Sequence, residues 1–231
     1  MTPSPPPAVA PLWRRALAEF LGAGLLVTVV IGSGIAAERL SPGDVGLQLL
    51  ENSLATALGL AVLILVFQTV SGAHLNPVVT LADRALGARR GPVEISVYVV
   101  AQIAGGIGGA VLANTMFGVA TTISSKDRLG AGHLLAEVVA TAGLVLVIFA
   151  LVRTGRAAFV GPAVGAYIGA AYWFTSSTSF ANPAVTIGRI FSDTFAGIAP
   201  GCVPWFIGAQ LVGGALGLAL VLVLFPRKAT L

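Results

Sequence analysis

The sequence predicts an all-α membrane protein in which six transmembrane helices and two re-entrant half-helices form an inverted repeat. Three observations carry this prediction: long stretches without charge, a pattern that recurs once along the chain, and two Asn-Pro motifs inside overlong apolar stretches. Only 10% of the 231 residues are charged and 56% are hydrophobic, whereas a soluble domain carries about 25% charged residues. This composition excludes a soluble enzyme, a disordered tail protein and a nucleic-acid binder. The single cysteine excludes a disulfide framework and a multi-thiol metal site, so neither a metal nor a cofactor is expected.

The stretches without charge locate the spans. Asp, Glu, Lys and Arg are absent from 20–37, 52–82, 95–125, 138–152, 157–188 and 194–226. A spanning helix needs about 20 apolar residues. The predicted spans are therefore roughly 13–36, 50–70, 94–117, 131–153, 157–176 and 202–225. The stretches 52–82 and 157–188 each exceed one span by about ten residues, and their surplus has to be accommodated in another way.

The distribution of Lys and Arg predicts the orientation. With the N-terminus in the cytoplasm, nine of the 13 basic residues fall on the cytoplasmic side and four fall outside, which matches the usual excess of positive charge on that side. Both termini are therefore predicted to be cytoplasmic. Residues 1–12 are Pro-rich and are therefore expected to be a disordered tail. A cleaved signal peptide is not expected there, because the segment lacks a positively charged n-region. Residues 226–231 are expected to be a cytoplasmic tail.

The chain repeats itself in three places. The matching pairs are 17–19 with 135–137, 71–80 with 177–186, and 101–106 with 209–214, at offsets of 118, 106 and 108 residues. Each repeat holds three spans. Because three is an odd number, the second half must enter the membrane from the opposite side, which predicts an inverted repeat about an axis in the membrane plane.

The surplus segments contain the two Asn-Pro motifs. Asn is a good N-cap, and Pro is favoured at the first helical position because its missing N–H is not needed there. A helix from Asn76 to about Leu86 would be roughly 16 Å long, which is half the thickness of the hydrocarbon core. The residues before each Asn predict extended backbone, which is tolerated at membrane depth only where protein or a water-filled cavity satisfies it. Two such half-helices entering from opposite faces would bring Asn76 and Asn182 together near the midplane.

With these motifs, the sequence resembles the major intrinsic protein family, the aquaporins and aquaglyceroporins. The resemblance covers about residues 13–225 and implies a single channel domain, with repeat one at about 13–117 and repeat two at about 131–225. The pore motifs of the family fall on Asn76, Pro77, Val78, Asn182, Pro183 and Ala184. The first motif ends in Val where the family usually has Ala, which affects packing between the motifs and not the Asn donors. Residues 175–206 are similar to a bacterial subgroup associated with arsenic resistance.

The resemblance implies a homotetramer in the inner membrane of a bacterium, with one pore in each subunit. Each Asn would offer N–H donors to a passing oxygen, and both half-helices would point positive N-terminal ends at the centre, which opposes cations and protons. Backbone carbonyls would supply acceptors in single file at Gly72, Ala73, His74, Leu75, Thr178, Ser179, Phe180 and Ala181.

Two intramembrane carboxylates, Glu19 and Glu137, are functional candidates by their position alone. A proton-coupled transporter would use them to carry protons. Their symmetric placement, one in each repeat, favours a support role in which they accept N–H bonds from the re-entrant segments.

The outer constriction of the family is formed by four positions. Carried over without gaps, these are Thr56, Ala170, Ser179 and Val185. The last position is usually Arg in this family. A filter without a fixed cation, His or bulky aromatic residue is expected to be wider and less polar than a water-selective one. Arg189 lies one helical turn beyond Val185, and either a displaced filter arginine or a structural partner of a carboxylate or carbonyl fits that position.

The sequence therefore predicts a passive channel for water, glycerol-like polyols and neutral metalloid acids such as arsenous acid. The alternatives are a water-selective aquaporin and a proton-coupled secondary transporter, which also uses inverted repeats and broken helices. No enzymatic activity and no nucleic-acid partner are expected. The expected partners are small neutral solutes, water and the lipid bilayer.

Overall fold

The computed structural model describes residues 10–226. Residues 1–9 of the expected N-terminal tail and residues 227–231 of the expected C-terminal tail lie outside this range. Six helices are long and apolar enough to cross a membrane, and the described residues contain no strand. The long helices are α1 (Leu12–Leu40), α2 (Val45–Phe67), α4 (Pro92–Met116), α5 (Ala131–Arg153), α6 (Val160–Phe174) and α8 (Val203–Leu224). Short 3-10 turns, Ala157–Phe159 and Pro200–Cys202, lead into α6 and α8.

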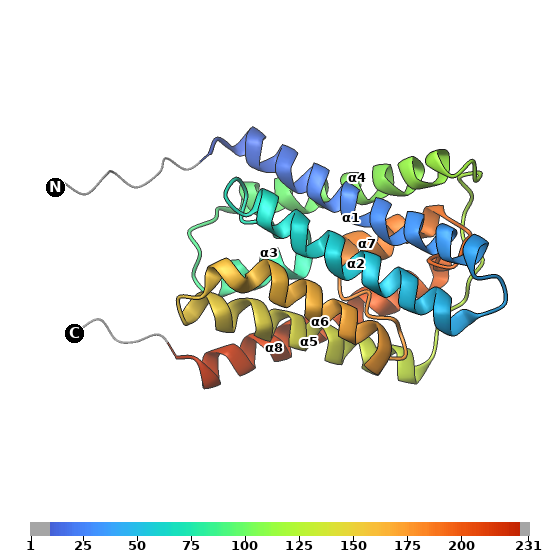
Figure 1. The fold of residues 1–231 in the computed structure, drawn as a ribbon. Helices are drawn as coiled ribbons and strands as arrows, with labels where there is room; N and C mark the ends of the chain where they lie inside the picture. The colour runs from blue at the N-terminus through green and yellow to red at the C-terminus, as the bar shows by residue number, and fades with distance from the viewer. Residues whose placement is uncertain (1–9, 227–231) are drawn as a thin grey trace, which may run out of the picture.

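Two short helices, α3 (Pro77–Ala85) and α7 (Pro183–Gly188), occupy the predicted half-helix positions. Both follow the expected chemistry at the N-terminus: the Asn76 side chain accepts from the N–H of Val78, and the Asn182 side chain accepts from the N–H of Ala184. A 3-10 turn, Arg189–Phe191, continues α7. In Figure 1 both short helices lie among the six long ones, and α1 begins at the same end of the bundle at which α8 ends.

The helices of each repeat cross closely at glycines. A Cβ on Gly105 would lie 2.1 Å from the Phe20 carbonyl oxygen, and one on Gly109 would lie 2.1 Å from that of Gly24, so α4 packs against the backbone of α1. In the second repeat a Cβ on Gly213 would lie 2.4 Å from the Val138 carbonyl oxygen, and α8 packs against α5 in the same way. Such contacts between small residues are a usual means of packing membrane helices.

Each half-helix also packs on the other repeat. The backbone of α7 reaches α4, where a Cβ on Gly188 would lie 2.6 Å from the Gly106 carbonyl oxygen. In turn, Val78 of α3 fills the space over Gly214 of α8, where a Cβ would lie 2.5 Å from the Val78 side chain. The two repeats are thus joined through α3 and α7.

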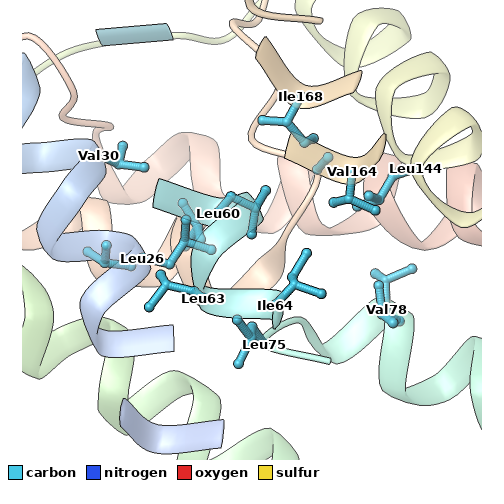
Figure 2. Close-up of a cluster of buried hydrophobic side chains, with 14 of the residues drawn as sticks. Leu26, Val30, Leu60, Leu63, Ile64, Leu75, Val78, Leu144, Val164 and Ile168 are labelled. Carbon is cyan, nitrogen blue, oxygen red and sulfur yellow. The ribbon is translucent and has the colours of Figure 1, made fainter. Parts of the chain in front are cut away.

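The apolar interior surrounds the pathway described below. Leu26 and Val30 of α1, Leu60 of α2, Leu144 of α5 and Ile168 of α6 belong to one buried cluster. Figure 2 shows these side chains extending from their separate helices, with Leu75 beside Ile64 at the lower edge of the group. Van der Waals packing of these side chains stabilises the bundle, and the same side chains give the space between the helices an apolar wall.

Candidate pore

Asn76 and Asn182 both line a cavity of about 320 Å³. The long helices α1, α2, α5 and α6 contribute apolar side chains to its wall, whereas none of the lining residues comes from α4 or α8. Those two helices lie behind the half-helices, against which they pack. Most of the remaining lining comes from the two re-entrant segments, and the lining also includes Arg90, which follows α3, and Ala157, in the 3-10 turn before α6.

Each of the two asparagines donates a hydrogen bond to the backbone of the re-entrant segment that carries the other. Asn76 Nδ2 donates to the carbonyl oxygen of Ala181 over 2.8 Å, and Asn182 Nδ2 donates to the carbonyl oxygen of Leu75 over 2.8 Å. An amide NH₂ group carries two donors. Because the side-chain oxygens cap α3 and α7 and one N–H of each amide is used across the interface, each asparagine retains one N–H donor. Both residues line the cavity.

The backbone before each Asn has an unusual conformation. Ala73, Leu75, Ser179 and Ala181 have φ between 46° and 52°, and Thr178 has a φ of 62°. These values lie in the left-handed region, which is costly for residues other than Gly and persists only when the surroundings enforce it. Of the eight residues predicted to supply carbonyls, Gly72, Ala73, His74, Leu75, Ser179, Phe180 and Ala181 line the cavity, and Thr178 does not.

The two buried carboxylates enforce this backbone. Glu19 accepts from the N–H groups of His74 and Leu75, at 3.0 and 2.6 Å, and from the Ser71 hydroxyl and the Gln102 amide. Its side chain therefore fixes two of the residues that precede Asn76.

Glu137 repeats this arrangement in the second half. It accepts from the N–H groups of Phe180 and Ala181, both at 2.9 Å, and from the Ser177 hydroxyl and the Gln210 amide. Glu19 and Glu137 are both 0% exposed, and neither lines the cavity. Their geometry is that of support for the loops.

Three of the four predicted filter positions meet at the cavity. Thr56, Ser179 and Val185 line it. Ala170, however, is exposed on the outer face of α6 and does not line the cavity, so this predicted position is wrong. Ala170 was predicted because it lies twelve residues before Asn182, the spacing that the family would give without gaps. This spacing assumes a fixed geometry for the segment between the two residues, and the left-handed residues in that segment change its geometry.

Tyr172 of α6 faces the cavity in place of Ala170. Its hydroxyl lies 3.1 Å from the Thr56 hydroxyl oxygen, and its side chain is buried. The sequence analysis missed this residue. The available signal was helical spacing, because Val164, Ile168 and Tyr172 recur every four residues on one face of α6.

The four predicted filter positions include no fixed cation and no bulky aromatic residue, but residues outside these positions bring both to the cavity. Arg189, Phe180 and Tyr172 all line the cavity. Arg189 is buried, its Nε donates to the Ala196 carbonyl oxygen, and its guanidinium carbon lies 3.4 Å from the centroid of the Phe180 ring. The carbonyl partner was one of the two possibilities considered for Arg189. The other was a displaced filter arginine; Arg189 lines the cavity, and a filter role for it stays a prediction.

A polar cluster lies at the opposite end of the cavity. Arg90 donates from Nε to Asp83 Oδ2 over 2.8 Å and also to Glu94, while His74 Nε2 lies 3.5 Å from the same Asp83 oxygen. Burial lowers the pKa of Arg90, but its hydrogen bonds to Asp83 and Glu94 outweigh this effect and raise the pKa above its ordinary value. Arg90 therefore stays charged. This cluster was not predicted from the sequence, because it depends on how the connection between α3 and α4 turns Arg90 toward both carboxylates.

Comparisons with known proteins agree with this architecture. The family model described as "Major intrinsic protein" matches residues 8–181. The chain is 48% identical to the aquaglyceroporin AqpS of Rhizobium meliloti (strain 1021), over 91% of this chain and 89% of that protein. It is 32% identical to the glycerol uptake facilitator protein of Pseudomonas aeruginosa, over 98% of this chain and 92% of that protein.

A solved structure shares the fold. The X-ray structure of the aquaglyceroporin from Plasmodium falciparum superposes with a TM-score of 0.70 at 22% identity, covering 91% of this chain and 96% of that chain. Six apolar helices, two half-helices that meet at their asparagines and these matches lead to one conclusion: the chain belongs to the major intrinsic protein family.

Proposed function

We propose that this protein is a passive transmembrane channel for water and small neutral hydroxylated solutes of the glycerol class. The observation that carries the proposal is the free N–H donor that each of Asn76 and Asn182 retains beside the cavity. A hydroxyl oxygen that arrives there exchanges a hydrogen bond with water for one with the protein. Because the helices contribute an apolar wall, the solute binds weakly and at few points, as conduction requires.

The composition of the lining supports solutes larger than water. Val185 stands where the family usually has Arg, and Ser179 and Thr56 are small. Neutral metalloid acids such as arsenous acid are similar to glycerol in size and in the number of their hydroxyl groups, so the proposal includes them. The relative AqpS is named an aquaglyceroporin, which supports this solute class without naming a metalloid.

A water-selective channel is the second candidate, and one observation favours it. Tyr172 places an aromatic ring at the cavity and is hydrogen bonded to Thr56, which narrows a filter that the residue types alone would leave wide. A water-selective channel would pass water and exclude glycerol.

A proton-coupled transporter is disfavoured by the state of the two carboxylates. Glu19 and Glu137 each accept four hydrogen bonds, and neither lines the cavity. A carboxylate whose oxygens are already occupied by loop donors is poorly suited to exchange protons with a passing substrate.

The proposed setting follows from the family and the composition. We propose a homotetramer in a bacterial inner membrane with both termini in the cytoplasm. The excess of Lys and Arg on that side supports the orientation. The common end of the bundle at which α1 begins and α8 ends supports the placement of both termini on one side (Figure 1).

Stopped-flow light scattering on proteoliposomes tests the proposal. Water, glycerol, urea and arsenous acid are compared one by one with protein-free vesicles. The expected result is glycerol flux that rises linearly with concentration and ignores a pH gradient. Flux that saturates at low concentration and follows the pH gradient would indicate the transporter, and water flux without glycerol flux would indicate the water-selective channel.

A variant pair links the flux to the proposed donor. Asn182→Asp keeps the size and the capping oxygen but removes both N–H donors, and it is expected to reduce glycerol flux at least tenfold. Asn52→Asp removes the same group from a buried asparagine that bonds the Val30 carbonyl oxygen and does not line the cavity. Equal losses in the two variants would contradict the role of the donor.

A further inference from the structure

Arg189 is a buried cation whose hydrogen-bonding capacity is largely unused. A guanidinium carries five N–H donors. Within residues 10–226 only Nε has a hydrogen-bond partner, the Ala196 carbonyl oxygen. The ion pairs found in that range involve Arg15, Arg90 and His74 and leave Arg189 without a carboxylate. The residue is 2% exposed and lines the cavity.

The position of the guanidinium is fixed by an aromatic ring. Phe180 presents its face to Arg189, with 3.4 Å between the guanidinium carbon and the ring centroid. Arg128 lies over the same ring at 5.4 Å, and Phe206 packs edge-on against it at 5.1 Å. Because Arg tends to stack its plane on aromatic faces, Phe180 acts as a positioning residue that holds Arg189 in place.

A second polar group without a partner lies on the same cavity. The Ser179 hydroxyl oxygen is buried and has no hydrogen-bond partner among the described residues. A buried hydroxyl without a partner is costly. Ser179 follows directly on Thr178 and precedes Phe180, so its place in the chain adjoins the ring on which Arg189 rests.

We propose that Arg189 and Ser179 form an outer solute-binding subsite that selects small oxyacids and polyols presenting two oxygens side by side. The terminal nitrogens of a guanidinium form a fork that matches two such oxygens, and the Ser179 hydroxyl completes the site as donor or acceptor. The subsite extends the proposed channel function, because it would concentrate these solutes before they meet Val185. It also returns a fixed cation to a pathway that lacks the usual arginine, one helical turn further along α7.

Saturation-transfer NMR with formate tests the subsite on the whole purified protein in detergent. Formate is planar, carries two adjacent oxygens and is a direct probe of the fork. The wild type is expected to bind it saturably, with glycerol as a competitor. Arg189→Gln is expected to weaken binding by roughly tenfold to a hundredfold, in line with the loss of charge-assisted hydrogen bonds. Arg189→Lys, which keeps the charge without the fork, is expected to bind formate more weakly than the wild type and more tightly than Arg189→Gln.

Arg39 offers a matched control. It also donates to a backbone carbonyl, that of Phe117, and lies over the Phe117 ring at 5.6 Å, but it is exposed and does not line the cavity. Arg39→Gln is expected to bind formate as the wild type does, and Ser179→Ala is expected to bind it several-fold more weakly. No saturable binding by the wild type, or unchanged binding by Arg189→Gln, would overturn the subsite.

Glycerol flux in vesicles made from the same preparations separates this inference from the proposed function. Formate binding that depends on Arg189, in a protein that conducts no glycerol, would refute the channel proposal and leave the subsite standing. Glycerol conduction with formate binding that does not depend on Arg189 would refute the subsite alone.

Discussion

The hydroxyl groups of Thr56 and Tyr172 lie 3.1 Å apart, which joins α2 of the first repeat to α6 of the second across 116 residues of sequence. Both side chains are buried and line the cavity. The bond fixes the Tyr172 ring, so the ring forms a rigid part of the wall.

Tyr172 is therefore expected to limit the size of the solute. Tyr172→Ala should raise the permeability to a five-carbon polyol such as ribitol several-fold and change that to water little, because the ring is the largest group that α6 brings to the cavity at this level. The measurement is stopped-flow light scattering on proteoliposomes. Tyr172→Phe keeps the ring and loses only the bond to Thr56, so it serves as the control, and equal ribitol flux in the Ala and Phe variants would argue against a size limit at Tyr172.

Val185→Arg should reduce the uptake of glycerol and arsenous acid several-fold and reduce the permeability to water less. The new guanidinium would occupy the cavity one turn before Arg189, where a like charge at this spacing is also mildly destabilising. Uptake assays on vesicles of matched protein content report the effect. Val185→Leu adds bulk without charge and is the comparison. If glycerol uptake in the Arg variant stays at the wild-type level, Val185 does not lie in the constriction.

Glu137→Gln should destabilise the protein, although Glu137 does not line the cavity. The new NH₂ group would face two of the four donors that now bond the carboxylate, and each buried donor left unpaired costs about 1–3 kcal/mol. Thermal unfolding in detergent should show a lower Tm. Glu38→Gln changes an exposed carboxylate that accepts one bond, from the N–H of Phe195, and should shift Tm little. Equal shifts in the two variants would speak against the support role.

Gly109→Ala should disrupt the packing of α4 on α1. The added methyl would lie 2.1 Å from the Gly24 carbonyl oxygen, a backbone atom that cannot move away without displacing the helix. The neighbouring Gly108→Ala puts the same methyl into open space, with nothing within 4 Å. The yield of folded protein by fluorescence-detected size-exclusion chromatography should therefore fall for the first variant and stay unchanged for the second. Similar yields would mean that the helices do not cross as closely as described.

The stability of the folded protein should decline in acid, because the carboxylate of Asp193 accepts hydrogen bonds from a neighbouring loop. Asp193 accepts from the N–H of Ser125 over 2.9 Å and from the hydroxyls of Ser124 and Ser125, and these bonds lower its pKa below the ordinary 3.8. A carboxyl with a depressed pKa in the folded state contributes stability above its unfolded pKa, and this contribution is lost as the pH falls through the folded value. The difference in Tm between the wild type and Asp193→Asn should therefore be constant above about pH 5 and shrink below 3.8. A difference that stays the same at pH 3 would contradict this.

The spans and half-helices could be predicted closely from the sequence because hydrocarbon excludes charge and because Asn-Pro starts a helix locally. The segment 131–153 was expected as a span and matches α5, Ala131–Arg153. The half-helix expected from Asn76 to about Leu86 has these two residues as its caps. In both cases the determining residues lie inside the element itself.

Three of the four predicted filter positions line the cavity: Thr56 in α2, and Ser179 and Val185 beside the second motif. Ser179 and Val185 lie three residues from Asn182 and both line the cavity, and their role in selecting the solute stays a prediction. Ala170 does not line it, because the left-handed residues between α6 and Asn182 set the position of α6 relative to the pathway. The side chain that takes its place, Tyr172, shares one face of α6 with Val164 and Ile168, which is visible in the sequence, but its contact with Thr56 is seen only in the folded chain.

The exchange of hydrogen bonds between the two asparagines also bears on how the chain is made. The amide of Asn76 donates to a carbonyl that is synthesised 105 residues later. At about 5–20 residues per second, that interval is roughly 5–20 s. During this time the first half-helix lacks both the partner at its tip and α8, against which it also packs, so the first half of the chain alone cannot complete its part of the pathway. The pore is therefore expected to form late, when the segment that ends at Asn182 enters the membrane. Translation that stops before this point would yield membrane spans without a channel.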